Sequence, residues 1–311
     1  MVNASLIGRT EVTSGKKISP IKRDEMSEPN FVIRELEDAD LGHLAGLLTE
    51  GFSRRSVEFW AARLERLRTR NPAPGTPRYG YGIEDNGLQG AALALGSVHG
   101  PEDTPQTIVN ISSWTVRPSH RGPAAKELYR YASSFDGQTF SNLSAAAHTL
   151  KTITKFGFRE GTAGQIIGIG TRRSPGTPRR VIALKDAPAA GLSAGKLDVL
   201  RYHQDRGCVV FCLELADRLA PLVFLPRRLA LGMPVAQLIY CEAWSDFIDH
   251  SRLIYTSLLA KGWAALLVDA SGPIPGLQGR YFPGKAAKYY KGPSPSYAVD
   301  HSYSEMIYIG F

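Results

Sequence analysis

The chain has 311 residues, of which 43% are hydrophobic, 21% charged and 9% aromatic. One domain usually holds about 150 residues, so this length predicts two packed domains. The composition is close to that of globular proteins and excludes a disordered or fibrous chain. No stretch approaches the ~18 uninterrupted apolar residues of a membrane helix, and residues 1–30 contain no apolar signal core. We therefore expect a folded, soluble protein without membrane insertion.

Lys and Arg outnumber Asp and Glu by 37 to 29, which gives a formal net charge of +8. This excess favours anionic partners such as phosphates, acidic polymers or nucleic acid. Three cysteines, Cys208, Cys212 and Cys241, are too few for a zinc cage, and the first two lie in an apolar, strand-like run. We interpret all three as buried thiols of a reducing compartment, which predicts a cytoplasmic protein. The histidines show no metal spacing, so no metal site is expected.

Hydrophobic periodicity predicts a mixed sheet in the first half of the chain. Residues 1–30 have no apolar period, and we expect them to be poorly ordered. A short strand begins near Phe31, and apolar residues then recur at helical spacing in 41–52 and in 57–67. Three strands, a helix, a strand, a helix and a strand are predicted next, over 79–84, 88–99, 107–116, 124–135, 138–144, 145–157 and 158–169. This order is typical of a mixed α/β (α+β) sheet and not of a doubly wound one.

The second half is predicted to repeat this architecture without repeating the sequence. Residues 171–180 contain four arginines, two prolines and no acid, so we expect an exposed linker there. The elements predicted after it are a helix (196–207), three strands (207–215, 220–231 and 235–244), a helix (246–262), a buried strand (263–270), a helical or loop segment (279–292) and a final strand (303–311). The predicted domains are therefore 31–170 and 181–311, preceded by a flexible segment.

Two motifs carry a family resemblance. A predicted strand leads into Val116-Arg-Pro-Ser-His-Arg-Gly-Pro-Ala-Ala-Lys-Glu-Leu128, and Lys155-Phe-Gly-Phe-Arg-Glu160 follows further along the chain. Their order and spacing resemble the GNAT acyltransferase superfamily, in which a strand ends in V-x-P-x-x-R-G-x-G-x-G/A and a later helix ends in G-F. The resemblance covers residues 31–170 and implies GNAT-like domains in tandem, of which the second is degenerate. It also implies acetyl-CoA or another acyl-CoA as the co-substrate.

The loop that begins at Val116 has the chemistry of a phosphate site. A strand that turns into the start of a helix directs its free backbone N–H groups to one place, where they favour a pyrophosphate. Arg121 adds a charge-assisted contact, and Gly122 lets the backbone approach closely. Ala124 and Lys126 stand where the family has its second and third glycines, and the intervening proline removes one donor. The predicted cofactor site comprises Val116, Arg121, Gly122, Ala124, Ala125 and Lys126.

Acyl transfer needs oriented reactants, a donor to the thioester carbonyl and a group that takes a proton from the acceptor. The resemblance implies that the strands over 107–116 and 138–144 splay apart where the thioester enters. The backbone N–H of Val116 is then the expected donor to the carbonyl.

Strand alternation predicts polar side chains that face this gap, none of them a strong base: Asn110, Ser112, Trp114, Asn142 and Ser144. The family often has a tyrosine where this chain has Ile153, so the usual general acid is missing. We therefore predict that the proton leaves through water relayed by Ser112 or Asn142. His148 is the best side-chain candidate, because an imidazole titrates near neutral pH.

In the second half, Asp246 and Asp249 occupy the matching strand-to-helix junction and would repel a pyrophosphate, so no second CoA site is predicted. Lysines and tyrosines alternate later in the chain and indicate either a basic-aromatic rim for an anionic or carbohydrate substrate or a solvated helix face. These residues are Lys285, Lys288, Lys291, Tyr281, Tyr289 and Tyr290.

The favoured function is transfer of an acyl group, in the first place acetyl, from acyl-CoA to an amine or hydroxyl of a small-molecule or carbohydrate acceptor. The second half is then expected to shape the acceptor site at the domain junction. Two alternatives stay open. One is an aminoacyl-tRNA-dependent peptidyltransferase of tandem GNAT-like fold, which the net charge would suit although nucleic acid is not the favoured partner. The other is a GNAT-like binding module without catalysis.

Overall fold

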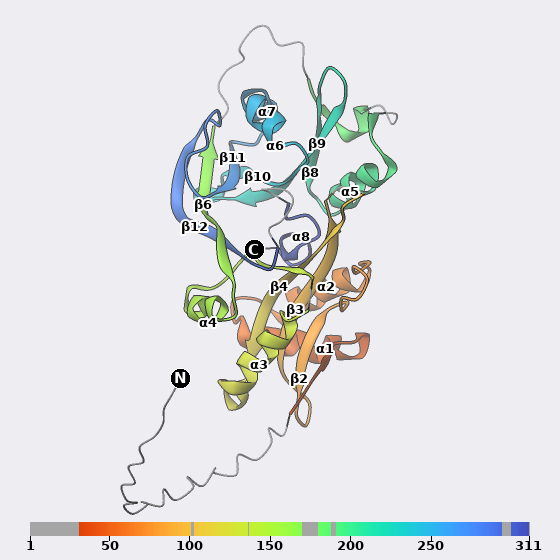
Figure 1. Ribbon diagram of the computed structural model, residues 1–311, viewed down its shortest axis with the longest axis vertical. Helices are drawn as coiled ribbons and strands as arrows, with labels where there is room; N and C mark the ends of the chain where they lie inside the picture. Colours follow the sequence, from red (N-terminus) through yellow and green to blue (C-terminus); the bar gives the residue numbers. More distant parts are fainter. Residues whose placement is uncertain are drawn as a thin grey trace, which may run out of the picture. The chain divides into compact units, whose positions relative to one another are not determined.

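The computed structural model describes residues 31–100, 103–135, 137–169, 180–187, 191–293 and 300–310. The strands of this part of the chain join into one mixed sheet of twelve strands, in the order β1-β2-β3-β4-β5-β12-β6-β11-β10-β9-β8-β7 (Figure 1). The segment 1–30 and nearly all of the expected linker lie outside the described residues. The domain bounds at 31–170 and 181–311 therefore stay a prediction.

In the first half, the elements lie close to where the periodicity predicts them. The strands are β1 (Val32–Glu35), β2 (Gly80–Glu84), β3 (Leu88–His99), β4 (Gln106–Val116), β5 (Thr139–Asn142) and β6 (Arg159–Gly168). The helices are α1 (Leu41–Gly51), α2 (Val57–Arg68), α3 (Pro123–Ala132) and α4 (Leu150–Lys155), with the short 3-10 helices η2 (Pro118–His120) before α3 and η3 (Ala147–Thr149) before α4. Strands β1 to β4 form antiparallel neighbours, and β5 pairs parallel with β4 because α3 crosses between them.

The second half follows the predicted order as far as β11, except that a strand at 181–183 was not predicted and the single helix predicted over 246–262 is divided in two. Its strands are β7 (Val181–Ala183), β8 (Val209–Glu214), β9 (Leu219–Arg228), β10 (Pro234–Cys241), β11 (Ala265–Ala270) and β12 (Arg280–Lys291). Its helices are α5 (Ala194–Asp205), α6 (Trp244–Asp249), α7 (Ser251–Ala260) and α8 (Glu305–Tyr308). Two predictions near the C-terminus are wrong. The segment 279–292 holds a strand instead of a helix or loop, and the predicted final strand over 303–311 holds the short helix α8.

Strand β12 forms because both of its edges are paired. It lies between β5 and β6 and is antiparallel to each. Its register on β6 shifts between Pro283 and Lys288, and Ala286 has a φ of 51° within this interruption. The spacing of its lysines imitates a helix, but hydrogen bonding along two edges outweighs such a local pattern. Helix α8 begins where the Ser304 side chain accepts a hydrogen bond from the N–H of Met306 (3.4 Å).

The two halves have the same strand order, and each is completed by a strand from the other half: β12 completes the first half and β6 the second. Strands β1 to β5 run inward from one edge of the sheet, and β7 to β11 run inward from the other. Between them, β12 lies next to β5, and β6 lies next to β11. The parallel pair of β4 and β5 has its counterpart in the parallel pair of β10 and β11. The predicted α/β (α+β) fold of two similar mixed-sheet halves in tandem is thus confirmed.

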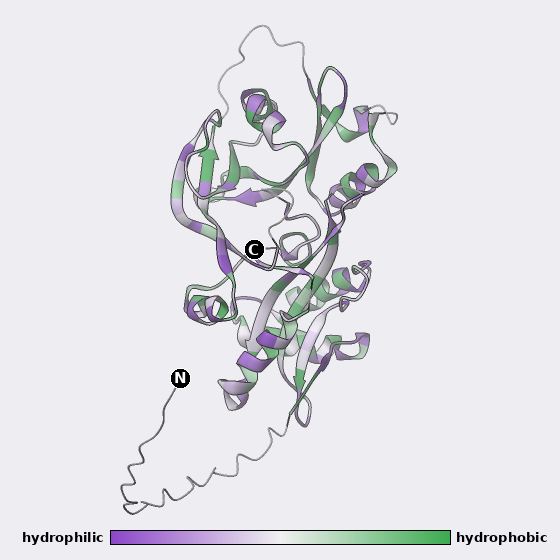
Figure 2. Ribbon diagram, viewed as in Figure 1, coloured by the Kyte–Doolittle hydropathy of each residue, from purple (hydrophilic) through white to green (hydrophobic). Residues whose placement is uncertain are grey.

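Helices cover both faces of the sheet. In the first half, α1 and α2 pack on one face and α3 and α4 on the other, so the side chains of β3 are buried alternately on each side. In the second half, α5 packs on one face and α6 and α7 on the other. Helices α3, α4 and α7 show both hydrophilic and hydrophobic residues (Figure 2), as expected when one side of a helix meets a sheet. Helix α8 joins both halves, because Tyr308 packs in the α1–α2 core and Met306 in the α5 core.

The cysteines are buried and unpaired, as predicted, and burial raises the pKa of Cys212 to about 11. No helix in the described ranges is long and apolar enough to cross a membrane. The basic-aromatic rim is not formed as predicted, because Tyr289 and Tyr290 pack on opposite faces of β12, although Lys288 and Tyr289 both line a cavity. Lys288 is only 3% exposed and donates a hydrogen bond to the carbonyl oxygen of Leu143 (2.8 Å). Tyr289 is buried in the α3–α4 core, so the alternative of a solvated helix face is wrong as well.

Candidate functional site

Strands β4 and β5 run side by side for three residues and then separate. Residues 108–110 pair in parallel with residues 139–141, and no later β4–β5 pair is found in the described part of the chain. The N–H of Arg117 donates to the carbonyl oxygen of Gln89 on β3 (2.9 Å). Neighbouring residues of a strand direct their N–H groups to opposite edges, so the N–H of Val116 points away from β3 and into the gap. This is the geometry expected for a donor to the thioester carbonyl.

A β-bulge bends β4 beside the gap. The register of β3 and β4 shifts at residues 113–114, where Ser113 has a φ of 48°. The extra residue reverses the alternation of side chains beyond it. Asn110 and Ser112 face α8, whereas Trp114 packs on a tyrosine ring of α3. The prediction that these three side chains share one face is therefore wrong for Trp114.

The loop after β4 presents backbone donors at the start of α3. Gly122 has a φ of 98°, and a Cβ placed on it would meet no atom within 4 Å. Pro123 is the first residue of α3. The N–H groups of Ala124 and Ala125 lie in the first helical turn, whose donors have no partner within a helix. Open space and unpaired donors are what an approaching phosphate needs.

An ion pair and a histidine–carboxylate contact hold this loop in place. Arg117 pairs with Glu50 of α1 (2.8 Å), and Nε2 of His120 lies 2.9 Å from the Asp85 carboxylate in the β2–β3 turn. Arg121 is exposed, and its Nε donates to the carbonyl oxygen of Val116 (3.1 Å). Its terminal nitrogen atoms make no hydrogen bond to a described residue. The residues predicted to bind the cofactor thus lie together on one loop, and their role stays a prediction.

Glu305 of α8 lies at the base of the gap between β4 and β5. Its carboxyl group accepts a hydrogen bond from the Ser112 hydroxyl on β4 and lies beside the Ser144 hydroxyl and the Leu143 N–H that follow β5. Its backbone N–H donates to Oδ1 of Asn110 (2.7 Å). The side chain is 0% exposed, and Oε1 has no hydrogen-bond partner in the described residues. Burial raises the pKa of Glu305, because desolvation disfavours the charged carboxylate.

Tyr129 of α3 lies on the opposite face of the same gap. Its ring contacts Trp114 of β4 (centroids 4.7 Å apart), and its hydroxyl oxygen accepts a hydrogen bond from Nδ2 of Asn142 on β5 (3.1 Å). Because Asn142 is the donor, the phenolic hydrogen is left to bond another group. No acceptor for it is found in the described residues. Burial raises the pKa of Tyr129, so the phenol keeps its proton.

The structure places the predicted catalytic residues in different surroundings. Ser112 and Asn142 both line the gap, each held by a partner that the sequence did not indicate. His148 is exposed on η3, and no hydrogen bond joins it to a described residue. Glu305 and Tyr129 were not predicted as site residues from the sequence. A signal for Glu305 existed, because it is the only charged residue in the run SYSEMIYIGF at 302–311.

The fold of this chain is similar to the folds of solved GCN5-related N-acetyltransferases. A GCN5-related N-acetyltransferase from Anabaena variabilis has a similar structure, with a TM-score of 0.54 and 12% identity over 84% of this chain and 72% of that chain. A putative acetyltransferase from Pyrococcus horikoshii has a TM-score of 0.52 and 13% identity over 92% of this chain and 97% of that chain. A GCN5-related N-acetyltransferase from Kribbella flavida has a TM-score of 0.51 and 13% identity over 84% of this chain and 70% of that chain.

The resemblance seen in the sequence is confirmed at the level of the fold. At identities of 12–13%, these similarities concern the fold alone. No protein-family model matches the chain, and its sequence is similar to no curated protein.

Proposed function

We propose that the protein transfers an acyl group, in the first place acetyl, from acyl-CoA to an amine or hydroxyl. The observation that carries this proposal is the gap between β4 and β5, which opens directly beside the free N–H groups at the start of α3. The pyrophosphate of the donor would lie on the backbone from Val116 to Lys126 and pair with Arg121. The thioester would then reach into the gap and accept a hydrogen bond from the N–H of Val116.

Glu305 and the phenol of Tyr129, the two buried proton-bearing groups on either side of the gap, suit the proton transfers of this reaction. The acceptor nitrogen or oxygen attacks the carbonyl carbon, its new bond forms, and the carbon–sulfur bond breaks. Glu305 takes the proton that the acceptor loses, either at Oε1 or through the hydroxyl of Ser112. A carboxyl group whose pKa is raised by burial is a better proton acceptor near neutral pH than an ordinary one. The phenol of Tyr129 donates a hydrogen bond to the departing thiolate.

These assignments replace part of the sequence-based mechanism. A water relay through Ser112 needs no further base if the relay ends on Glu305, which the Ser112 hydroxyl already contacts. Asn142 acts through Tyr129, whose phenol it orients. His148 is left without a step in the reaction.

Calorimetric titration of acetyl-CoA and of free CoA tests the donor site. Arg121→Glu should weaken binding by about 1.5–3 kcal/mol, the loss expected for a charge-assisted hydrogen bond. Arg252→Glu, on the exposed surface of α7, makes the same change of charge far along the chain and serves as the control. If both variants bind CoA as the wild type does, the cofactor lies elsewhere. If the wild type binds no CoA at all, the proposed function is wrong.

A further inference from the structure

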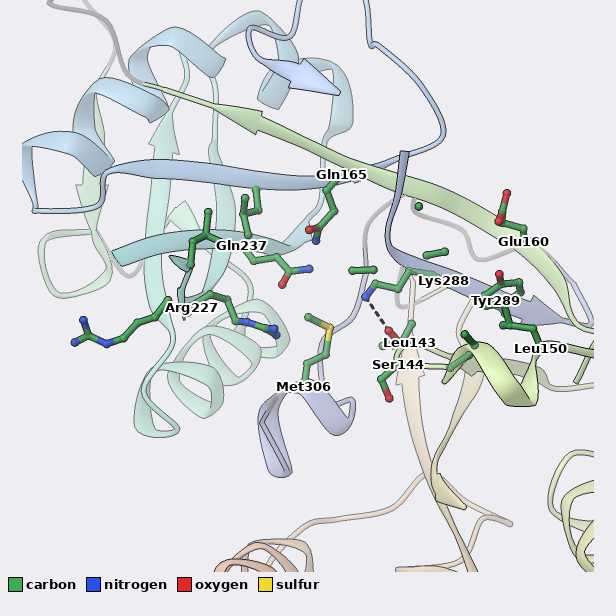
Figure 3. A pocket seen from close by; sticks show the side chains of 18 residues that line it. Leu143, Ser144, Leu150, Glu160, Gln165, Arg227, Gln237, Lys288, Tyr289 and Met306 are labelled. Atoms are coloured by element: carbon green, nitrogen blue, oxygen red, sulfur yellow. Dashed lines mark hydrogen bonds between the residues drawn. The ribbon is translucent and has the colours of Figure 1, made fainter. Parts of the chain in front are cut away.

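A cavity of about 490 Å³ lies where the two halves meet. Its lining comes from the end of β5 and the start of α4, from β6, β9, β10, β11 and β12, and from α8. Figure 3 shows Gln165, Gln237 and Lys288 around the same space, with Ser144 and Met306 on the side of β5 and α8. The volume is in the range of small-molecule sites, which run from about 300 to 1,000 Å³.

One arginine of the cavity lining has no hydrogen-bond partner among the described residues. Arg227 of β9 is half-buried in the lining and makes no hydrogen bond or ion pair with a described residue. Burial lowers its pKa, and the charge of Asp269 opposes this only in part. Among the acids near the cavity, Asp269 is fully engaged, and Glu160 lies at the exposed end of β6. An arginine fork that faces a cavity without a partner suits an anionic group.

Asp269 is saturated by other donors and makes no direct ion pair with Arg227 in the described residues. Its carboxylate accepts hydrogen bonds from Nε2 of Gln165 (2.8 Å), Nε2 of Gln237 (3.2 Å) and Nε2 of His301 (3.1 Å). Because both glutamines use their NH₂ groups on Asp269, their carbonyl oxygens are left to accept hydrogen bonds. The cavity therefore offers a cation at one place and acceptor oxygens at another.

The cavity also lies next to the group that we propose takes the proton. Leu143 and Ser144 line it, and the same two residues lie beside the carboxyl group of Glu305. Met306, the residue after Glu305, lines it as well. A molecule bound here would therefore contact residues that lie beside Glu305, at the base of the β4–β5 gap.

We propose that this cavity binds the acyl acceptor, and that the acceptor is an amine that carries a carboxylate or phosphate. The anionic group pairs with Arg227, and the carbonyl oxygens of Gln165 and Gln237 hold the ammonium group. The ammonium releases one proton to solvent to become the free amine, and the amine gives its second proton to Glu305 as the carbon–nitrogen bond forms and the carbon–sulfur bond breaks. The role of the molecule as acceptor rests on the proposed function. The binding of an anionic group at Arg227 does not.

Binding is tested with sulfate as the probe, on protein saturated with CoA so that the loop before α3 is already filled. Heats of sulfate titration are compared for the wild type, Arg227→Gln, Arg227→Lys and Arg252→Gln, at constant ionic strength. The wild type and Arg252→Gln should bind sulfate alike, and Arg227→Gln should lose about tenfold or more in affinity. Arg227→Lys keeps the charge without the fork and should fall between them. Circular dichroism checks that each variant is folded. Equal affinities in the wild type and Arg227→Gln would overturn the proposal.

The acceptor class is tested with matched amines and acetyl-CoA, by following the release of the CoA thiol. The pairs are phosphoethanolamine with ethanolamine, and β-alanine with β-alaninamide. In each pair, the anionic amine should have a kcat/KM about tenfold higher, and Arg227→Gln should remove this preference. A preference for the neutral amines, or one that Arg227→Gln does not change, would contradict the proposal. Absence of CoA binding would remove the acceptor role, and the sulfate titration, repeated with Arg121→Glu, would still decide the anion site.

Discussion

The stability of the C-terminal segment should depend on pH through His203. This side chain lies on α5 and is 0% exposed. Its Nδ1 lies 2.7 Å from the carbonyl oxygen of Val199, and the backbone N–H of Tyr303 donates to Nε2 (3.2 Å). The ring therefore holds its proton on Nδ1 and accepts on Nε2. A proton on Nε2 would break the bond to Tyr303, two residues before Glu305.

Burial lowers the pKa of His203 from 6.5 to about 4, although the hydrogen bond to the Val199 carbonyl oxygen and the charge of Asp300 oppose this shift. Since the pKa is lower in the folded state, the unfolded chain binds the proton first as the pH falls below 6.5. The stabilisation is fully present above that pH and is lost as the pH approaches 4. A difference of about 2.5 pKa units corresponds to a loss of about 2 kcal/mol by pH 5 and about 3 kcal/mol by pH 4.

Urea unfolding, followed by tryptophan fluorescence at pH 7, 5 and 4, measures this loss. Other groups also titrate in this range, so the quantity to compare is the difference in free energy of unfolding between the wild type and His203→Gln. That difference should shrink by about 3 kcal/mol from pH 7 to pH 4. His43→Gln, at an exposed position of α1, should keep the pH dependence of the wild type. Parallel curves for the wild type and His203→Gln would refute the reasoning.

Three further substitutions test the site. Glu305→Gln should lower kcat/KM by about 10²- to 10⁴-fold, the usual contribution of general acid–base catalysis, and leave the Kd of CoA unchanged. An unchanged rate would remove Glu305 from the mechanism. His148→Ala should keep its rate within about a hundredfold, whereas a loss beyond about ten-thousandfold in folded, CoA-binding protein would make His148 essential. Gly122→Ala places a Cβ at a φ of 98° and should cost about 1–3 kcal/mol, seen as a lower Tm and weaker CoA binding, and an unchanged Tm would contradict the strain argument.

The parts of the fold that the sequence predicted are held by local patterns. Strand β3 has a continuous apolar run at 91–95 because both of its faces are covered. The loop from Val116 to Pro123 could be found because a strand, a glycine and a helix start are adjacent in the chain. The cofactor residues proposed from the sequence therefore lie together in the structure. Their position follows from contacts between near neighbours, which a single sequence records well.

The groups proposed to transfer protons could not be found in this way, because they are brought together from distant parts of the chain. Ser112 and Glu305 are 193 positions apart. The bulge at Ser113, which turns Trp114 to the α3 side, leaves no mark in the alternation of the sequence. The run Met-Ile-Tyr-Ile at 306–309 has the composition of a strand. It contributes to helix α8 instead, because it is buried between the two halves.

The strand exchange explains why a site on the first half depends on the second. Within the sheet, β12 covers the edge of β5 that faces away from β4, so the far wall of the gap is held by a strand that follows the whole second half. Its Lys288 binds the carbonyl oxygen of Leu143 at the point where β5 ends, and α8 then brings Glu305 to the same place. The second half is not expected to bind a phosphate, but the chain that follows it returns to the first half as β12 and α8. In the proposed reaction, β12 therefore holds the far wall of the gap, Glu305 takes the proton, and Arg227 selects an acceptor with an anionic group.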